Sequence, residues 1–368
     1  MPFDDLVKEA GRVMVICNAC RYCEGYCAVF PAMERRRTFS EKDLKYLANL
    51  CHDCRGCYYA CQYAPPHEFD LNFPKALGEL RLETYRQFAR PGFLAGLFRR
   101  NGTALFLISM LGIAAVFLLA LMLQGVFPLF SAHAGENSFY RVIPYLLIVL
   151  PFSAVALYAL ACIVSGMIAF WREIGGTPRE LADFGANRKA IGEVLRLKYL
   201  DGGGYGCNYP DDRFSLIRRR FHHLVFYGVL LCFASTTVAA VYHHLFHWNA
   251  PYLFFSWPVV LGTAGGLSLL AGTAGLLYLK QRMDPEPAVV RSYAMDAGFL
   301  GLLFLTSLTG FLLLFLRETP AMGILLTVHL GLVLGLFITL PYGKFVHAGY
   351  RYLALMRNVR EEAGEKPS

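Results

Sequence analysis

Six stretches of the chain are long and apolar enough to cross a membrane, and they constrain the fold more than any other feature. A spanning helix needs about 20 mostly apolar residues. Uncharged runs of that length, repeated six times, are not typical of buried helices in a soluble protein. The sequence therefore predicts a bundle of six transmembrane helices, at residues 103–126, 142–170, 222–246, 257–279, 297–316 and 321–343.

Charged residues are distributed unevenly, which separates a polar head from the membrane part. Only 17% of the 368 residues are charged, against roughly 25% in a typical soluble domain. The first hundred residues carry a charge every few positions, whereas residues 103–130 carry none. We therefore expect a head of residues 1–98, a membrane domain of residues 99–350 with a loop at 171–221, and a tail of residues 351–368.

Lysine and arginine are concentrated on one side of the predicted bundle. Six spans place both termini on the same side, together with the loops at 171–221 and 280–296. Outside the head these segments carry eighteen lysines and arginines, whereas the opposite loops carry only Arg141 and Arg317. Positive residues accumulate on the cytoplasmic side, and the N-terminus shows no secretory signal. We predict that the head and both termini are cytoplasmic and that the +8 charge reflects topology, with no nucleic-acid partner.

Two segments repeat one cysteine spacing. The first cysteine motif is CNACRYCEGYC at residues 17–27, and the second is CHDCRGCYYAC at residues 51–61. This spacing is typical of iron–sulfur proteins with two [4Fe–4S] clusters, in which the fourth cysteine of each run binds the other cluster. The sequence therefore predicts one cluster on Cys17, Cys20, Cys23 and Cys61, and a second on Cys51, Cys54, Cys57 and Cys27. Ala28 and Gln62 replace the proline that usually follows each run.

Other uses of these cysteines fit less well. Structural zinc takes four ligands, usually as separated pairs, and disulfides are rare in the cytoplasm. Between the motifs, FSEKDLKYLANL indicates a helix capped by Ser40. We therefore predict an all-α fold, with a helical ferredoxin-like head rather than a βαβ one.

The loop at 171–221 contains a helix signal and then a glycine run. Thr177, Pro178 and Glu180 form a capping-box pattern, and the apolar residues that follow suit a helix on the membrane surface. The segment GGGYGCNYPDD lacks the ending of a P-loop. We interpret it as a flexible turn, with a partner-docking surface as the alternative.

Histidines of the third and sixth spans are expected at matching depths in the membrane. His222 and His243 are twenty-one residues apart, and His329 and His347 are eighteen apart. These separations are close to whole numbers of helical turns, so each pair lies on one helix face. Because the two spans run antiparallel, we predict that His222 meets His347 and that His243 meets His329.

Facing imidazoles indicate b-type haem, which neutral histidine ligates from both sides. Ionisable residues inside a bilayer are functional candidates by default. We predict one or two haems with these four histidines as axial ligands. His223 is an alternative to His222 and His244 to His243, and terminal histidines could instead lie at the membrane interface.

Five segments together resemble one known family over nearly the whole chain. These are the cysteine motifs, CNYPDD, FHHLVFYG and TLPYGKFVHAGYR, which are similar to the tricarballylate-utilisation protein B (CitB-type) family. The membrane part alone resembles the haem-bearing membrane subunits of nitrate reductase (gamma) and heterodisulfide reductase. The resemblance implies that the chain lies in the bacterial inner membrane and that it re-oxidises a flavin-dependent tricarballylate dehydrogenase.

The residues themselves indicate no substrate site. No G-x-G-x-x-G follows a strand, so neither a Rossmann flavin nor a nicotinamide site is evident. We predict an electron-transfer subunit rather than a catalytic one. Electrons would pass from a cytoplasmic FAD-dependent dehydrogenase through the clusters and haem to a membrane quinone.

Three other functions fit parts of the sequence. The same relay could serve another flavoprotein dehydrogenase or reductase, even from quinol to the partner. A membrane redox sensor is a second alternative, against which the facing histidines argue. A transporter with a metal-binding head is the third, but the spans lack the internal repeats expected of one.

Overall fold

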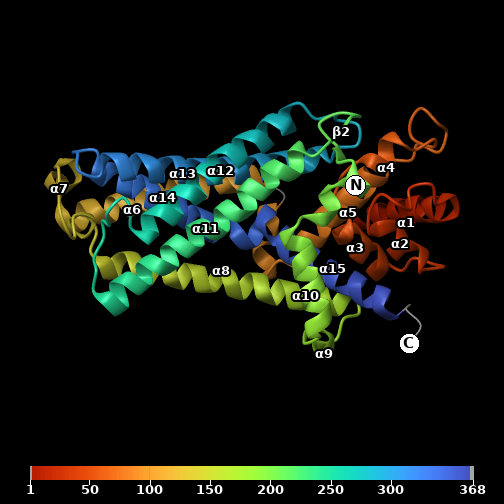
Figure 1. Ribbon diagram of the computed structural model, residues 1–368, viewed down its shortest axis with the longest axis horizontal. Coiled ribbons are helices and arrows are strands. Elements are labelled where there is room, and N and C mark those ends of the chain that lie inside the picture. The colour runs from red at the N-terminus through yellow and green to blue at the C-terminus, as the bar shows by residue number, and fades with distance from the viewer. Residues whose placement is uncertain (1, 99, 365–368) are drawn as a thin grey trace.

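The computed structural model describes residues 2–98 and 100–364 and is elongated and almost entirely helical (Figure 1). The first and last described helices, α1 and α15, both lie at the head end. Strands in the described ranges are limited to one short antiparallel pair, β1 (Cys207–Asn208) and β2 (Phe214–Ser215). The predicted all-α class is confirmed. The predicted domain boundary at residue 99 and the last four residues of the predicted tail lie outside the described residues.

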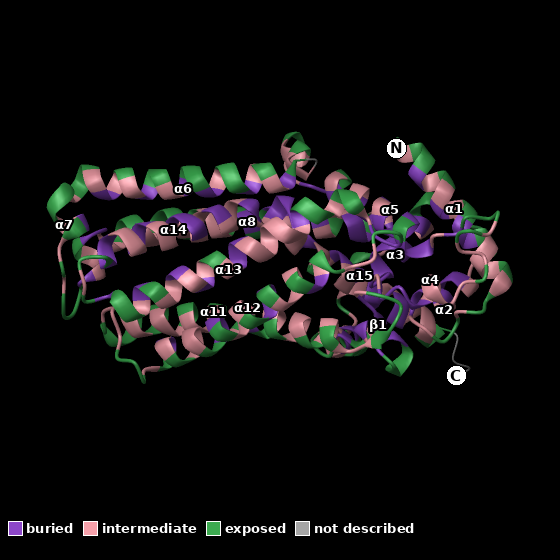
Figure 2. Cartoon of the chain, turned by 90° about the horizontal axis from the view of Figure 1, so that it is seen from above, coloured by how far each residue is buried: buried purple, intermediate pink, exposed green. Residues whose placement is uncertain are grey.

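The head is a compact set of helices with a buried core (Figure 2). Residues 2–98 form no strand in the structure, so the head is helical as predicted. Helix α3 begins after Ser40, where the Asp43 carboxylate accepts hydrogen bonds from the Ser40 backbone N–H, at 3.1 Å, and from its hydroxyl. The helices are α1 (Phe3–Cys20), α2 (Val29–Glu34), α3 (Glu41–Leu50), α4 (Gly56–Tyr59) and α5 (Phe73–Gln87).

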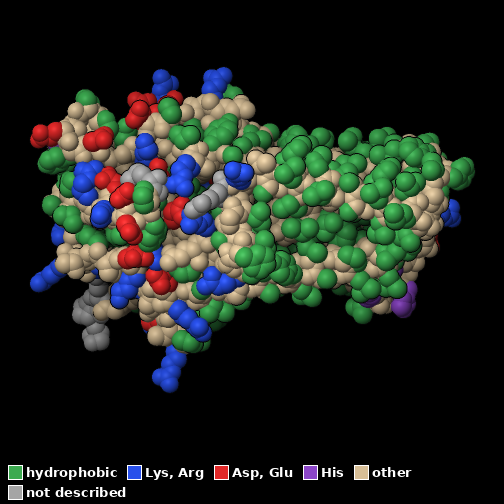
Figure 3. Space-filling model, turned by 180° about the vertical axis from the view of Figure 1, so that it is seen from behind, with side chains coloured by type: hydrophobic (Ala, Val, Ile, Leu, Met, Phe, Trp, Pro, Cys, Tyr) green, Lys and Arg blue, Asp and Glu red, His purple; other side chains and the backbone are tan. Residues whose placement is uncertain are grey.

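Six helices in the described residues are long and apolar enough to cross a membrane, and they overlap the six predicted stretches. Hydrophobic side chains cover this bundle, whereas charged side chains gather over the head end (Figure 3). The chain is therefore a multi-pass membrane protein. The helices are α6 (Asn101–Gln124), α8 (Tyr145–Glu173), α11 (Ile217–Phe246), α12 (Trp257–Gln281), α13 (Tyr293–Leu316) and α14 (Met322–Thr339), with the short α7 (Val126–Phe130) at the far end.

The sixth predicted span does not continue as one helix to His347. Helix α14 ends at Thr339, two short 3₁₀ turns follow, and α15 (His347–Gly364) begins at the histidine itself. Pro341 has no backbone N–H to donate, and Gly343 is extended. The continuous helix that we assumed between His329 and His347 is therefore wrong.

Helix α15 accounts for most of the predicted tail, and it packs into the core of the head. Leu353, Ala354 and Met356 are buried in the same hydrophobic cluster as Leu47 of α3. The aromatic rings of Phe88 and Tyr350 meet Phe170 of α8, at 5.6 and 5.1 Å between centroids, in this cluster. The head, the base of the bundle and the end of the chain therefore share one core.

The loop between α8 and α11 forms two helices rather than the one expected. The predicted capping box is confirmed, because the Thr177 N–H donates to Glu180 Oε2 at 2.6 Å. Helix α9 (Pro178–Leu181) then ends, and Asp183 caps α10 (Phe184–Leu195) by accepting from the Ala186 N–H at 3.0 Å. Helix α10 lies against α15.

Glycines allow α6 and α14 to approach closely. A Cβ added at Gly331 of α14 would lie 2.4 Å from Ile113 Cα, and one added at Gly112 of α6 would lie 2.7 Å from the Gly331 carbonyl oxygen. Small residues commonly permit such backbone contact between membrane helices. The α6–α14 contact therefore depends on the absence of a side chain at these positions.

We predict that Gly331→Ala destabilises the bundle by about 1–3 kcal/mol, the usual cost of overpacking. The matched control is Gly301→Ala in α13, where an added Cβ meets no atom within 4 Å. Thermal unfolding of both variants in the same detergent checks this. Equal midpoints for the two variants would contradict the close packing.

Candidate functional site

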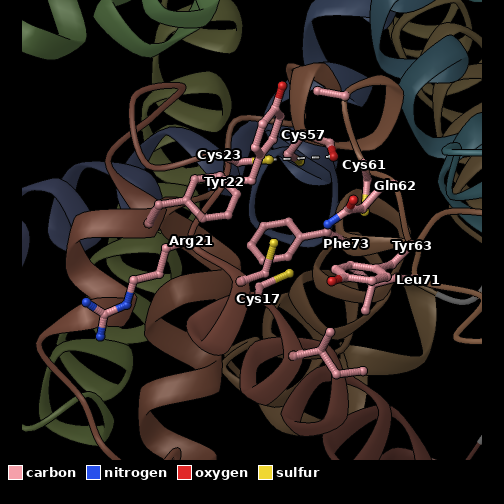
Figure 4. Close-up of a pocket in the computed structure, with 14 residues that line it drawn as sticks. Cys17, Arg21, Tyr22, Cys23, Cys57, Cys61, Gln62, Tyr63, Leu71 and Phe73 are labelled. Carbon is pink, nitrogen blue, oxygen red and sulfur yellow. Dashed lines mark hydrogen bonds between the residues drawn. The ribbon is translucent and has the colours of Figure 1, made fainter.

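Cysteines from both motifs line one cavity of about 190 Å³ in the head (Figure 4). Cys17 and Cys20 lie at the end of α1, where Arg21 adopts a left-handed conformation (φ 56°) and ends the helix. Cys23 follows in the turn, and Cys61 reaches the cavity from the second motif. The structure thus brings the four cysteines predicted for the first cluster to the same cavity.

Cys57, predicted for the second cluster, also lines this cavity, and its carbonyl oxygen lies 4.0 Å from Cys23 Sγ. Burial raises the pKa of Cys57, and the next contributions come from Cys54, Cys27 and Cys51, ahead of Cys23. Cys57 therefore lies near cysteines of both predicted sets.

The cysteine thiols repel one another as anions. Burial, followed by the nearby Cys61, Cys23 and Cys20, raises the pKa of Cys17 to about 12. Burial and then Cys51 raise the pKa of Cys27 to about 12. Thiolates at these positions need a bound cation to offset the repulsion, because metal binding deprotonates its thiol ligands.

Within residues 2–98 and 100–364, no three His, Cys, Asp or Glu side chains converge closely enough to hold a single metal ion. An iron–sulfur cubane makes a different demand, since its four cysteines bind different iron atoms of the cluster. The thiols of Cys17, Cys20, Cys23 and Cys61, spread around the head cavity, fit that donor set.

The glycine run packs onto the cysteine motifs and is not the flexible turn that we expected. The Asn208 N–H donates to the Cys54 carbonyl at 2.9 Å. A Cβ added at Gly203, where φ is 77°, would lie 3.0 Å from the Gly25 carbonyl oxygen. Cys207 between them is fully buried. The loop therefore covers the second motif and touches the first, because residues without a side chain allow the backbones to meet.

A second cavity, of about 330 Å³, lies between the head and the bundle. His52 of the second motif, His222 of α11 and His347 of α15 all line it. The apolar wall of the cavity comes from α11, α12 and α13. The apolar residues of this wall include Val225, Phe226, Val229, Leu276, Phe299 and Leu303.

His222 and His347 face each other in this cavity, with ring centroids 6.2 Å apart and ring planes at 76°. Two imidazoles that bind one metal from opposite sides through bonds of ~2 Å also place their ring centres about 6 Å apart. His347 Nδ1 donates to the Lys344 carbonyl at 2.5 Å, which leaves Nε2 to act as a ligand. His222 Nδ1 is buried without a hydrogen-bond partner.

The protonation state of His347 also suits a ligand. Burial, followed by the charges of Arg351 and Lys344, lowers the pKa of His347 well below its usual range. The imidazole is therefore neutral, the form that binds metals. His223, the alternative to His222, does not line the cavity; its ring lies 5.9 Å from that of Tyr227.

His243 and His329 are not brought together in the same way. The His243 ring stacks on Tyr145 at 3.8 Å, and His244 Nε2 lies 2.9 Å from the Tyr145 hydroxyl. His329 Nδ1 lies 3.1 Å from Thr309 Oγ1. Among the described residues no ring contact joins His243 to His329, because α11 packs along α12 and α14 packs along α6. This pair stays a prediction.

Three residues of the second cavity were absent from the sequence-based predictions. His52 directly follows Cys51, and its Nδ1 lies 2.8 Å from the Leu50 carbonyl. Arg81 of α5 and Arg351 of α15 donate to the Cys51 carbonyl at 2.6 and 2.9 Å. Two features of the sequence could have indicated these residues. One is a histidine inside a cysteine motif, and the other is an arginine four residues after His347.

Family models match almost the whole chain. Residues 96–368 match "Citrate utilization protein B", and residues 10–87 match the "Citrate utilization protein B Fer4-like domain". The second match indicates iron–sulfur binding by the head. No solved structure matches the chain.

A curated relative agrees with these models. "Citrate utilization protein B" from Escherichia coli is 50% identical over 353 residues, which cover 95% of this chain and 91% of the relative. The resemblance that we drew from the sequence motifs is therefore confirmed. The chain belongs to the citrate utilization protein B family.

Proposed function

We propose that the chain is a membrane electron-transfer protein that re-oxidises a cytoplasmic flavin-dependent dehydrogenase and passes the electrons to a membrane quinone. The observation that carries this proposal is the composition of the second cavity. His52, from the second cysteine motif, lines the same cavity as the facing His222 and His347. A cysteine-rich head and a histidine pair of the membrane part thus meet at one place.

Two [4Fe–4S] clusters are the proposed cofactors of the head. Cys17, Cys20, Cys23 and Cys61 would hold the first, and Cys51, Cys54, Cys57 and Cys27 the second. The cavity that the first set lines supports this assignment. In the second set, Cys51 helps to raise the pKa of Cys27, and Cys54 helps to raise the pKa of Cys57, so these cysteines are neighbours. The Arg81 and Arg351 guanidinium groups donate to the Cys51 carbonyl and add positive charge beside the second set.

A b-type haem is the proposed cofactor of the second cavity, with His222 and His347 as axial ligands. The apolar wall suits a porphyrin ring, and buried sites for large ligands are usually lined in this way. When bound, clusters and haem supply one-electron centres that link a two-electron flavin to a quinone. The loop packs on the second motif, where the Asn208 N–H donates to the carbonyl of the buried Cys54.

The proposed partner is a dehydrogenase that acts on a tricarboxylate. The name of the Escherichia coli relative refers to citrate, and the motif resemblance points to tricarballylate. The excess of lysine and arginine on the head side supports a cytoplasmic head in a bacterial inner membrane. A soluble cytoplasmic flavoprotein would then reach the head directly.

Inside-out membrane vesicles test this function. Tricarballylate dehydrogenase reduced by its substrate is mixed anaerobically with vesicles and a soluble quinone, and flavin absorbance is followed. We expect rapid flavin re-oxidation with vesicles that contain the chain, and loss of nearly all the stimulation for Cys54→Ser. Equal rates with and without the chain would refute the proposal.

The crossed cysteine assignment predicts paired effects. Cys61→Ala should remove the same low-temperature EPR signal as Cys17→Ala, and Cys27→Ala the same signal as Cys54→Ala, each with about half of the iron. Cys232→Ala in α11 serves as the control and should keep both signals. If Cys61→Ala removes the signal that depends on Cys54, the assignment is wrong.

The histidine assignment predicts changes in the visible spectrum. His222→Ala and His347→Ala should each abolish the dithionite-reduced b-type band of the haem in the second cavity, because each removes one axial ligand. His223→Ala should keep it. A second haem on His243 and His329 predicts that His329→Ala removes about half of the haem, and an unchanged haem content would exclude that second site.

A further inference from the structure

Six cationic side chains line the second cavity, and four of them have a carboxylate partner. Asp53 Oδ1 lies 3.7 Å from Arg55, and Asp53 Oδ2 lies 3.9 Å from Arg218. Asp296 lies 2.6 Å from Lys280 and 2.7 Å from Lys344. Glu193, the other acid of the cavity lining, forms its ion pair with Lys198 at 2.9 Å.

Arg81 and Arg351 are the remaining two cations, and in the described part of the chain neither forms an ion pair with a carboxylate. Both donate to the neutral carbonyl of Cys51, at 2.6 and 2.9 Å. Arg81 is only 8% exposed, and Nε of Arg351 is buried without a hydrogen-bond partner. Apart from the Cys51 thiolate that the proposed second cluster would supply, these two buried cations have no anion within ion-pair distance in the described part of the chain, so this end of the cavity favours an anionic ligand.

We propose that Arg81 and Arg351 bind a carboxylate in this cavity, and that it is a propionate of the haem proposed for His222 and His347. This inference rests on the proposed function and adds residues that recognise the cofactor. Guanidinium groups suit carboxylates because their planar donors match the two oxygens. The cavity has an apolar wall for the ring and a cationic edge for its acid groups.

The position of Arg351 on α15 supports a propionate in particular. His347 and Arg351 are four residues apart, so both side chains lie on one helix face, with the arginine about 6 Å further along the axis. A ligand held at His347 Nε2 would therefore have Arg351 on the same helix face as its anchor. Arg351 also touches Cys51, so one side chain would contact both the haem carboxylate and the second cysteine motif.

Haem titration of the full-length protein tests the proposal. The chain is produced without a haem supply, purified in detergent, and titrated with haemin or with haemin dimethyl ester, in which the propionates are uncharged. We expect wild type to bind haemin about tenfold or more tightly than the ester, the size of one charge-assisted hydrogen bond. Arg351→Gln and Arg81→Gln should lose this preference.

Two further variants keep the result interpretable. Arg317→Gln is the matched control, since Arg317 is also buried and donates to a carbonyl, that of Tyr252 at 2.6 Å, outside the cavity; it should keep the preference. Arg351→Lys retains the charge without the planar donors and should keep part of it. If both glutamine variants still prefer haemin as strongly as wild type, the proposal is overturned.

The remaining outcomes separate this inference from the proposed function. If wild type binds neither form, or if binding survives His222→Ala and His347→Ala, the haem assignment fails and this inference fails with it. A free carboxylate is the other source of the same chemistry, so tricarballylate is titrated in parallel. Binding of tricarballylate that is lost in Arg351→Gln, with the haemin preference intact, would overturn the propionate assignment.

Discussion

The packing of α15 beneath the head is the interaction on which the rest of the arrangement depends. Its buried face shares one hydrophobic core with α3 and the base of α8. The break at Pro341 allows the chain to leave α14 and start a new helix at His347. Because the first turn of that helix faces the bundle and the remainder lies under the head, α15 sets the position of His347 relative to the second cysteine motif.

The boundary between head and bundle gathers buried charge that a soluble domain would leave in water. Lys45, only 1% exposed, bonds to Glu173 of α8 at 2.6 Å, and the two aspartates of the second cavity each serve two cations. Breaking such pairs is strongly destabilising, although their net contribution to stability is small. Their geometry therefore constrains how the head sits on the membrane part more than it adds to the free energy of unfolding.

Much of the architecture could be predicted from the sequence, because local patterns determine it. Apolar length marks the six spans, and Ser40 and Thr177 mark helix starts through their own side chains. The interruption between His329 and His347 was missed, since Pro341 stands close to the expected end of a span, where a helix could end without a change of direction. The pairing of His222 with His347 was anticipated by an argument that assumed a continuous helix. The role of Gly203 and Asn208 could not be anticipated, because it depends on contact with residues about 150 to 180 positions earlier in the chain.

The second cysteine motif contributes to the cavity because His52, which lines it, directly follows Cys51 in the chain. Cys51 belongs to the predicted cluster ligands and His52 lines the cavity, and consecutive Cα atoms are ~3.8 Å apart across a trans peptide. Rocking of the head against the bundle could lengthen a contact between separate elements, but it cannot stretch a peptide bond. The spacing between the motif and this wall of the cavity is thus set by covalent geometry, and thermal motion of the head leaves it unchanged.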